Sequence, residues 1–253
     1  MKALVTGAAK GLGRALTEEL LQRGYEVIAA DVETEWLEDL GIAHGGACSI
    51  RFADMSNTSS VLRLLDSVDG VKFDLVVLSA GVSATGKFEE IPTFAYDKLI
   101  DINLRAPIVL ASSLVRLQAM VKGGKIVFVS SLSHAMGYPG ASVYSASKDG
   151  LAQYAKSVRK PFKKAGVRVL TVFPGPMVTE QAEKHAPPGS SAEKRMAPEK
   201  MARIILAASR RRSRELYPGY RAYAAMLLGK TFPTLATRLM RKGIFDKLDG
   251  PVY

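Results

Sequence analysis

Short apolar runs alternate with helical patterns along most of the chain. Several runs are almost entirely apolar, which is typical of parallel strands whose two faces are both covered by helices. Between them, apolar residues recur at helical spacing, as at Leu12, Leu16 and Leu20. This alternation predicts right-handed crossovers and an α/β fold with a doubly wound parallel sheet. The predicted strands are 2–6, 26–30, 49–53, 75–79, 125–130 and 168–173, and 215–217 could form a last short strand.

The pattern changes in two places toward the C-terminus. Residues 174–198 are rich in Pro, Gly, Ser and charge around Pro187-Pro188-Gly189, which predicts a long loop after the sixth strand. Ligands of doubly wound sheets bind beyond the carboxyl ends of the strands, so this loop could cover a substrate, although its composition also suits a disordered surface segment. Residues 220–253 mix apolar and basic side chains, and Pro233 should divide them into two short helices. We expect a single domain over 1–253, with a substrate loop and a C-terminal helical extension.

Composition and charge narrow the setting of the protein. The formal net charge is +11, of which residues 180–253 carry +8, and this field could attract phosphates, acidic proteins or an anionic membrane surface. A nucleic-acid partner is not favoured, because no recognisable binding motif accompanies the charge. Cys48 is the only cysteine, which excludes an intrachain disulfide, and no apolar run approaches the ~18 residues of a membrane-spanning helix. We expect a cytoplasmic protein without a metal site.

A glycine-rich turn joins the first strand to the first helix. Its sequence, Thr6-Gly7-Ala8-Ala9-Lys10-Gly11-Leu12-Gly13, has the spacing G-x-x-x-G-x-G. Small residues at such a turn let backbone amides approach a pyrophosphate, and the helix N-terminus adds favourable partial charge. Glycines at a tight turn can also be purely structural, but the strand before and the helix after favour a dinucleotide site formed by Gly7, Lys10, Gly11, Leu12 and Gly13.

Acidic residues after the next two strands bear on the choice of dinucleotide. Asp31 ends the second strand, where a carboxylate can accept hydrogen bonds from ribose hydroxyls and would repel a 2′-phosphate, so NAD is favoured. Lys10 argues for NADP, because its ammonium could reach that phosphate, unless it is simply a solvated surface lysine. Asp54 could accept a bond from the adenine amino group or cap the helix that begins near Asn57.

Tyr144 and Lys148 lie four residues apart and therefore on one face of a predicted helix. A nearby cation stabilises a tyrosinate and lowers the phenol pKa from about 10 toward neutrality. Such a tyrosine can exchange a proton with an alcohol or ketone oxygen, while a serine such as Ser131, at the end of the fifth strand, holds the same oxygen. Asn103 lies in a preceding helix. Ser131 could instead cap a turn, and Asn103 could be a buried amide bonded to backbone.

The joint set of motifs resembles the short-chain dehydrogenase/reductase family over residues 1 to about 210. It comprises the glycine-rich turn, Asp31, Asn103, Ser131, Tyr144-x-x-x-Lys148 and Pro174-Gly175. The resemblance implies a Rossmann-type fold with extra C-terminal helices. It implies Tyr144 as the acid or base, Ser131 as donor to the substrate oxygen, Lys148 as ribose anchor and as the group that tunes Tyr144, and Asn103 as holder of a relay water. Pro174 and Gly175 would border the nicotinamide, and Met55, beside Asp54, would join the cofactor site.

Two departures from the family pattern are visible. Ser79-Ala80-Gly81 stands where the family usually has Asn-Ala-Gly; serine can make part of the same backbone contact, so Ala80 and Gly81 remain expected cofactor neighbours. Residues 220–253 replace the glycine-rich tail that builds the tetramer of many members. By resemblance, helices at 94–119 and 142–160 would form a dimer face, which predicts a homodimer or homotetramer.

These features favour an NAD(P)-dependent oxidoreductase that transfers a hydride between nicotinamide and a carbonyl or secondary alcohol, with an apolar small-molecule substrate. One alternative is a 3-oxoacyl-thioester reductase that takes its substrate from an acidic acyl carrier protein, which the basic surface could attract. A second is a non-catalytic dinucleotide-sensing protein, although the intact Ser–Tyr–Lys set argues against it. The C-terminal extension could lie on a membrane surface, cap the substrate pocket or form a dimer contact.

Overall fold

The computed structural model describes all residues except 136, 186–194, 244 and 249. Within that part of the chain, seven parallel strands form one sheet in the order β3-β2-β1-β4-β5-β6-β7. The order reverses direction at β1, as in a doubly wound Rossmann-type sheet, so the predicted fold class is confirmed. The strands are β1 (Lys2–Thr6), β2 (Glu26–Asp31), β3 (Cys48–Phe52), β4 (Phe73–Leu78), β5 (Met120–Val129), β6 (Arg168–Val172) and β7 (Glu215–Leu216).

Strand β5 differs most from its prediction. It begins at Met120, which pairs with Phe73, and the register shifts before Lys125 pairs with Leu75. The intervening Gly123-Gly124 looks like a turn in the sequence, and Gly123 indeed has φ +87°. The chain nevertheless continues as an irregular strand, because the pairing with β4 resumes beyond the glycines.

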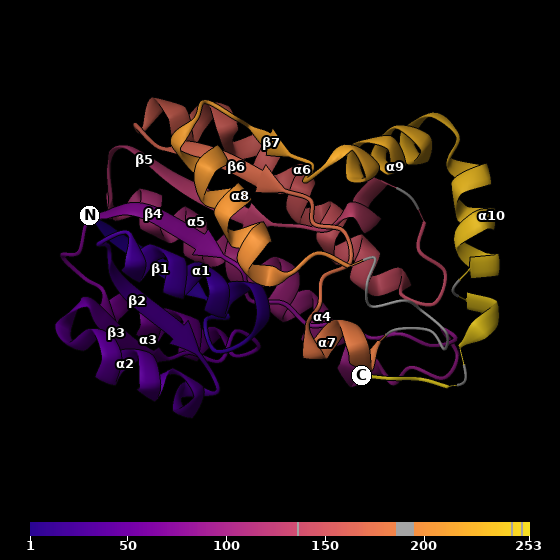
Figure 1. The fold of residues 1–253 in the computed structure, drawn as a ribbon, viewed down its shortest axis with the longest axis horizontal. Coiled ribbons are helices and arrows are strands. Elements are labelled where there is room, and N and C mark those ends of the chain that lie inside the picture. The colour runs from indigo at the N-terminus through magenta and orange to yellow at the C-terminus, as the bar shows by residue number, and fades with distance from the viewer. Residues whose placement is uncertain (136, 186–194, 244, 249) are drawn as a thin grey trace.

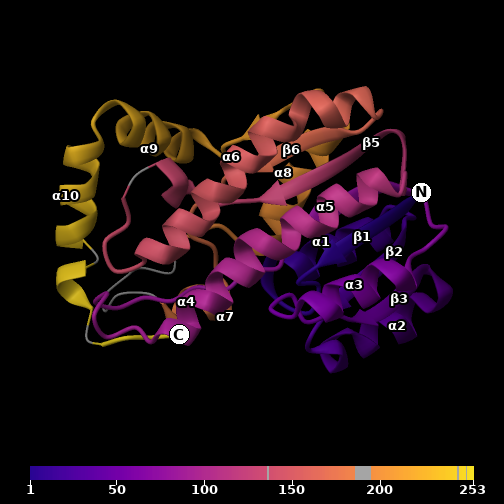
Figure 2. The same cartoon turned by 180° about the vertical axis from the view of Figure 1, so that it is seen from behind.

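Helices cover both faces of the sheet and bury alternate strand residues. Ala3 and Val5 face one core with α1, α2 and α8, whereas Leu4 faces a second core with α3, α5 and α6. Figures 1 and 2 show these two layers from opposite sides. The elements are α1 (Gly11–Gln22), α2 (Glu38–His44), α3 (Thr58–Ser67), α4 (Thr93–Ile100), α5 (Ala106–Arg116), α6 (Ser142–Lys164) and α8 (Pro198–Arg210).

The loop after β6 contains more structure than its composition predicts. A short helix, α7 (Glu180–Lys184), is capped by Thr179, whose Oγ1 accepts from the Ala182 amide at 3.1 Å. Met177 and Met196 form a parallel bridge across the base of the loop. The central Pro187-Pro188-Gly189 lies outside the described residues, so the prediction of a long loop there is neither confirmed nor contradicted.

The C-terminal region forms two helices, as predicted from Pro233. They are α9 (Tyr220–Thr231) and α10 (Pro233–Gly243), and both lie at one end of the molecule, beyond the sheet (Figures 1 and 2). After them the chain returns toward α4, and Val252 pairs with Thr85 in an antiparallel bridge. In the described chain, none of the helices combines the length and the apolar character needed to cross a bilayer.

Candidate active site

The glycine-rich turn has the close backbone approaches that make its glycines necessary. Gly7 has φ +68°, and a Cβ there would lie 2.7 Å from the Cα of Ala80. A Cβ on Gly13 would overlap the carbonyl oxygen of Gly7. Gly11 begins α1, and the preceding Lys10 makes no side-chain cap, so the first amides of a 12-residue helix face the turn. The glycines therefore let these backbone segments pack tightly beside the positive end of a helix, a position that suits a pyrophosphate. Leu12 is buried in the core, so only its backbone can contribute.

Asp31 holds this turn against the end of β2. Its Oδ2 accepts from the Ala9 amide at 2.9 Å and its Oδ1 accepts from the Glu33 amide at 3.1 Å. The carboxylate therefore fixes the shape of the turn itself. That structural role is additional to the ribose contact predicted for it, and the sequence gives no sign of it because Ala9 and Asp31 are distant along the chain.

Lys10 is already paired with carboxylates. Its Nζ lies 2.8 Å from Oε1 of Glu33 and 3.6 Å from Oε2 of Glu180, and it sits 4.9 Å from the centre of the Trp36 ring. The hydrogen bond to Glu33 is the main cause that raises the pKa of Lys10. The ammonium thus stays charged, but its charge is compensated before any phosphate arrives.

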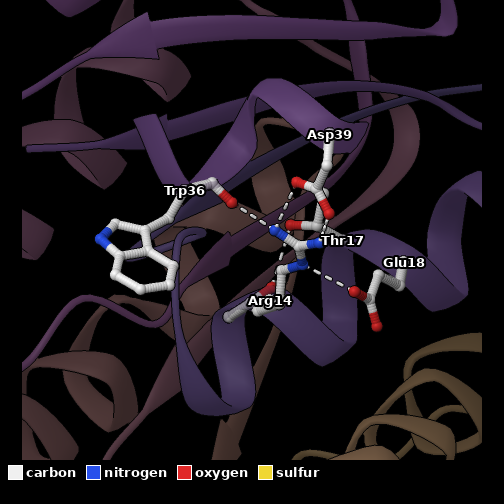
Figure 3. A network of polar contacts seen from close by, with 6 residues as sticks. Arg14, Thr17, Glu18, Trp36 and Asp39 are labelled. Atoms are coloured by element: carbon white, nitrogen blue, oxygen red, sulfur yellow. Dashed lines mark hydrogen bonds and ion pairs between the residues drawn. The ribbon is translucent and has the colours of Figure 1, made fainter. Parts of the chain in front are cut away.

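Arg14 joins α1 to the segment that follows β2 (Figure 3). Its Nε donates to Glu18 at 2.6 Å, and its terminal nitrogens bond the carboxylate of Asp39 and the carbonyl of Trp36. Thr17 on the same helix donates to the Gly13 carbonyl at 2.9 Å. The second cation close to the glycine-rich turn is therefore also engaged with carboxylates.

Asp54 and Met55, the two residues predicted to contact the cofactor after β3, have different surroundings in the structure. Asp54 accepts from the amide and hydroxyl of Ser56 through Oδ1, at 2.8 and 2.6 Å. The N-cap of α3 is Asn57, which accepts from the Ser60 amide, so Asp54 does not cap this helix. The side chain of Met55 is buried in the core beside α3 and α5, and any part it takes in a cofactor site is limited to its backbone.

Asn103 lies in a π-helical turn, Asp101–Arg105, between α4 and α5. Its side chain is fully buried; Oδ1 accepts from the Val82 amide and Nδ2 donates to the Val82 carbonyl, both at 2.9 Å. Nδ2 also donates to Oγ of Ser147 at 3.1 Å. The structure therefore shows the backbone-bonded amide, with π geometry that aims it out of the helix. The predicted relay water is not tested by these contacts.

Ser131, Tyr144 and Lys148 converge beside Asn103. Ser131 shares a side-chain hydrogen bond with Tyr144. The Nζ of Lys148 is buried and donates to the Val129 carbonyl at 3.1 Å. A Cβ on Gly81 would lie 3.0 Å from that Nζ and 3.2 Å from Oδ1 of Asn103, so a glycine is needed where β4 leads into this site.

The pKa of Tyr144 departs from the expectation drawn from the sequence. Burial raises it, and the hydrogen bond with Ser131 only partly opposes that effect. The predicted lowering by Lys148 does not offset this rise. Burial separately lowers the pKa of Lys148, to about 8. Burial disfavours the charged form of both groups, so tyrosinate is not stabilised and Tyr144 keeps its proton at neutral pH.

The segments around Ser131 and Tyr144 are tied together by hydrogen bonds to backbone groups. The Leu132 amide donates to the Pro174 carbonyl at 2.9 Å, which joins the turn after Ser131 to the end of β6, and Gly175 faces Leu132. Thr6 Oγ1 accepts from the amides of Ser79 and Ala80 at 3.2 and 3.3 Å. Thr6 was not among the predicted contacts, and it holds the backbone in place whichever residue stands at position 79.

Loop residues that the sequence did not single out close over this edge of the sheet. Gln181 in α7 can donate to the Gly81 carbonyl at 3.2 Å and accept from the Ser83 amide at 2.8 Å. His185 Nδ1 lies 3.0 Å from Oγ1 of Thr85. The N-cap threonine and the acidic residues after it are the signal that could have revealed α7.

An aromatic stack forms a wall beyond Ser131. The His134 ring stacks on Phe173 with 4.1 Å between centres, and Phe173 stacks on Tyr217 at 4.5 Å. His134 Nε2 also lies 3.2 Å from the Tyr217 hydroxyl. Each ring follows the carboxyl end of one of three neighbouring strands, β5, β6 and β7. The order of the strands in the sheet brings the three rings together. In the sequence, the only sign of this cluster is that each ring lies at the end of a predicted strand or follows it.

Comparisons with known proteins agree with this arrangement. The family model described as short chain dehydrogenase matches residues 1–188. A 3-oxoacyl-[acyl-carrier-protein] reductase of Rickettsia bellii is 29% identical over 182 residues, covering 72% of this chain and 75% of the relative. An uncharacterized oxidoreductase of Myxococcus xanthus is 34% identical, covering 68% and 70%. A Burkholderia cenocepacia short chain dehydrogenase in complex with NADP superposes with a TM-score of 0.77 at 27% identity, over 94% and 96% of the chains.

A doubly wound sheet, a glycine-rich turn at a helix N-terminus and a Ser–Tyr–Lys group, together with the match to the family model, define an oxidoreductase that uses a nicotinamide dinucleotide. The chain belongs to the short-chain dehydrogenase family. A Streptomyces avermitilis member matches it nearly end to end, with a TM-score of 0.79 over 98% of both chains at 25% identity.

Proposed function

We propose that the protein is an NADH-dependent reductase of apolar carbonyl compounds. The observation that carries the proposal is the partly buried Ser131–Tyr144 pair beside Lys148, in which desolvation keeps the phenol protonated. A protonated tyrosine can act as the acid that reduction of a carbonyl requires at neutral pH.

The glycine-rich turn and the α1 N-terminus would hold the dinucleotide phosphates, and Asp31 the adenosine ribose. Bound there, a nicotinamide dinucleotide would supply the hydride. Ser131 Oγ donates a hydrogen bond to the carbonyl oxygen, and Tyr144 transfers its phenolic proton to the same oxygen as charge develops on it. Lys148 would anchor the nicotinamide ribose. Asn103 is a positioning residue, since it fixes Val82 and with it the Gly81 backbone against Lys148.

Replacement of the acid tests the proposed chemistry. Tyr144→Phe should lower kcat for ketone reduction by about 10²–10⁴-fold and leave NADH binding nearly unchanged. Tyr154→Phe, on the same helix and packed against Phe128, is the matched control and should keep activity. The assay follows NADH oxidation with aliphatic and aromatic ketones. A Tyr144→Phe enzyme that reduces ketones at the wild-type rate would contradict the assignment, whereas a wild type that binds NADH but reduces none would favour a dinucleotide-sensing role.

The preference for NADH over NADPH rests on charge around the ribose. Asp31 would repel a 2′-phosphate, and the nearby Lys10 is compensated by Glu33 and Glu180. Glu33→Gln should therefore strengthen NADPH binding several-fold, because it releases the ammonium, and leave NADH binding nearly unchanged. Glu19→Gln breaks a comparable ion pair with Arg23 elsewhere on α1 and is the control. Titration calorimetry with both dinucleotides at one salt concentration measures this. Tighter NADPH than NADH in the wild type would reverse the preference.

A second candidate substrate is a 3-oxoacyl thioester on an acidic carrier protein. The curated relatives named 3-oxoacyl-[acyl-carrier-protein] reductase and the +8 charge of residues 180–253 favour it. The two candidate substrates can be distinguished by measuring KM for the carrier-bound thioester and for the same acyl group on a short thiol. A large drop in KM for the carrier form that salt abolishes would favour the carrier protein.

We further propose that the chain works as one domain in the cytoplasm, as a homodimer or homotetramer. The oligomer would pair helices α4, α5 and α6 between copies, and the C-terminal region would contact a membrane surface peripherally.

A further inference from the structure

The outward face of α9 is apolar along its whole length. Ala222, Met226 and Gly229 point into the protein and are buried. The opposite side shows Tyr220, Tyr223, Leu227 and Leu228, with exposed fractions of 78%, 53%, 46% and 37%. These positions follow the i, i+3, i+7, i+8 spacing of one helix face. The helix is thus anchored by small or flexible residues and presents its large apolar side chains to solvent.

Helix α10 continues the same pattern beyond the Pro233 break. Ala236 is buried, whereas Phe232, Leu235 and Leu239 are 58%, 49% and 54% exposed. The two helices pack against each other, so their exposed apolar residues belong to one end of the molecule (Figures 1 and 2). We call this set the C-terminal apolar face; it consists of Tyr220, Tyr223, Leu227, Leu228, Phe232, Leu235 and Leu239.

All charged residues within 220–243 are basic, and Arg241 among them lies 3.6 Å from Oδ1 of Asp246, just beyond α10. Residues 220–243 include no Asp or Glu, and their five cations are exposed. On α9 two of these cations lie on either side of the apolar stripe, and on α10 two lie along one edge of Leu235 and Leu239. The cations are Arg221, Lys230, Arg238, Arg241 and Lys242.

The apolar residues and the cations together indicate whether a second copy of the chain or a membrane binds to this face. A second copy across a two-fold axis would bring the same cations face to face, so the charge disfavours self-association here. Neither helix can span a bilayer. Apolar side chains flanked by cations are what an interfacial helix needs to sink into the headgroup region of an anionic bilayer. We propose that the C-terminal apolar face docks on the surface of anionic phospholipid membranes.

Docking would bring the substrate side of the enzyme to the lipid. Helix α9 packs on the 3-10 turn Leu132–Ala135, which directly follows Ser131, and Tyr223 contacts Tyr217 of the aromatic wall with ring centres 6.3 Å apart. On α10, Thr237 Oγ1 lies against Gly137. If the proposed reduction of apolar carbonyls holds, such substrates, which partition into bilayers, would reach Ser131 and Tyr144 from that surface.

Vesicle binding of the full chain tests the surface without requiring turnover. The experiment compares co-sedimentation with vesicles of phosphatidylcholine alone and of phosphatidylcholine mixed with phosphatidylglycerol. The wild type should bind the anionic vesicles on the order of tenfold or more tightly than the neutral ones, and added salt should weaken that binding. Tyr144→Phe should bind like the wild type, so a failure of the proposed chemistry leaves this result intact.

Two variants and a matched control locate the contact. Arg238→Gln/Arg241→Gln/Lys242→Gln should weaken binding to anionic vesicles by roughly tenfold to a hundredfold. Leu235→Gln/Leu239→Gln should weaken it while keeping its salt dependence. Lys160→Gln/Lys163→Gln/Lys164→Gln removes three exposed charges from α6 and should bind like the wild type. Circular dichroism and thermal melts confirm that each variant is folded.

Three outcomes would overturn the proposal. One is a wild type that sediments with neither vesicle. Another is an equal loss in the α6 control, which would show only unspecific attraction of a basic protein. The third concerns the leucine variant in the absence of vesicles. If it changes the sedimentation coefficient of the free protein, and the wild type binds no vesicles, the C-terminal apolar face is a contact between protein chains.

Discussion

At the scale of single residues, Lys148 combines burial with a charge on which the proposed site depends. Burial lowers its pKa to about 8, so the ammonium is present at neutral pH and is lost as the pH rises through about 8. If the charged form anchors the dinucleotide, NADH affinity should fall by up to about tenfold per pH unit above that value. Calorimetric titrations from about pH 7 to about pH 9 measure this. Lys148→Met should bind more weakly and without the pH dependence, and a wild-type affinity that stays constant over this range would contradict the prediction.

Lys125 is a second buried lysine, and its role is structural. Its Nζ donates to the carbonyl of Arg211 at 2.6 Å, at the end of α8. Desolvation, with a smaller effect of Arg168, lowers its pKa to about 8 from 10.5. Between these values the unfolded chain holds more protons than the folded one, so this lysine should make the free energy of unfolding rise with pH there.

Lys125→Met should remove the rise of the unfolding free energy with pH. It should also lower the unfolding free energy at neutral pH by about 1–3 kcal/mol, since it leaves a carbonyl near the end of α8 without its donor. Urea unfolding at neutral pH and near pH 10.5 measures both effects. Lys122→Met, in the same strand but exposed, is the control and should change neither. A Lys125→Met protein as stable as the wild type would show that the helix end does not need this bond.

Residue types and spacing predicted much of the site, but they did not predict what each side chain bonds. Ser131, Tyr144 and Lys148 could be identified because the chemistry requires those groups near one another. The hydrogen bond from the Ala9 amide to Asp31 and the pairing of Lys10 with Glu33 could not, because both link residues more than 20 positions apart. The direction of the Tyr144 pKa shift was wrong for a related reason. Burial depends on every neighbouring element, whereas the spacing to Lys148 concerns one helix.

At the scale of elements, the π turn between α4 and α5 is the least ordinary feature of the described helices. It places the Asn103 amide so that it satisfies both the N–H and the C=O of Val82. Asn103→Ala would leave both backbone groups without these partners in a partly buried place, at a cost of about 1–3 kcal/mol for each unsatisfied group. We therefore expect a loss of at least about 2 kcal/mol in the free energy of unfolding.

Urea unfolding of Asn103→Ala measures that loss, and Ser157→Ala is the control. Ser157 is exposed on α6, and its hydroxyl donates to the carbonyl of Gln153 in its own helix at 2.8 Å. Asn103→Ala should also raise the KM for NADH, because the Gly81 backbone is then less firmly held against Lys148. An unchanged unfolding free energy would mean that water replaces the amide.

The predicted elements were correct wherever hydrophobic periodicity decides the structure. The strands near the N-terminus alternate between the two cores, and the apolar side of helix α1 faces one of them. The π turn was missed because one extra residue in a turn hardly disturbs the apolar period over 94–119. Helix α7 was missed because four of its five residues are polar. Thr179 and the tertiary contacts of the helix, not an apolar face, stabilise it.

At the scale of the whole molecule, the C-terminal segment links parts of the chain that the sequence could not connect. Val252 exchanges two backbone hydrogen bonds with Thr85, at 2.8 and 2.7 Å, and the Tyr253 ring meets Phe94 edge-on with 5.5 Å between centres. Lys184 of α7 donates to the Tyr253 carbonyl at 3.1 Å. Gly86 leaves room for Pro251, since a Cβ there would lie 2.8 Å from its Cα. The end of the chain therefore joins the loop over the cofactor edge to the segment after β4.

Deletion of residues 251–253 should release this link without disturbing the sheet. The Thr85 amide loses its acceptor, the Val252 carbonyl, so its hydrogen exchange should accelerate on the order of tenfold or more, as expected when a protecting bond opens. The Val82 amide, three residues away, bonds to Asn103 instead and serves as the internal control that stays protected. Hydrogen exchange resolved by residue measures both amides in one sample. If the two accelerate together, the tail supports the whole segment after β4. If neither changes, the bridge between Thr85 and Val252 contributes no protection, and the C-terminal segment does not hold the loop in place.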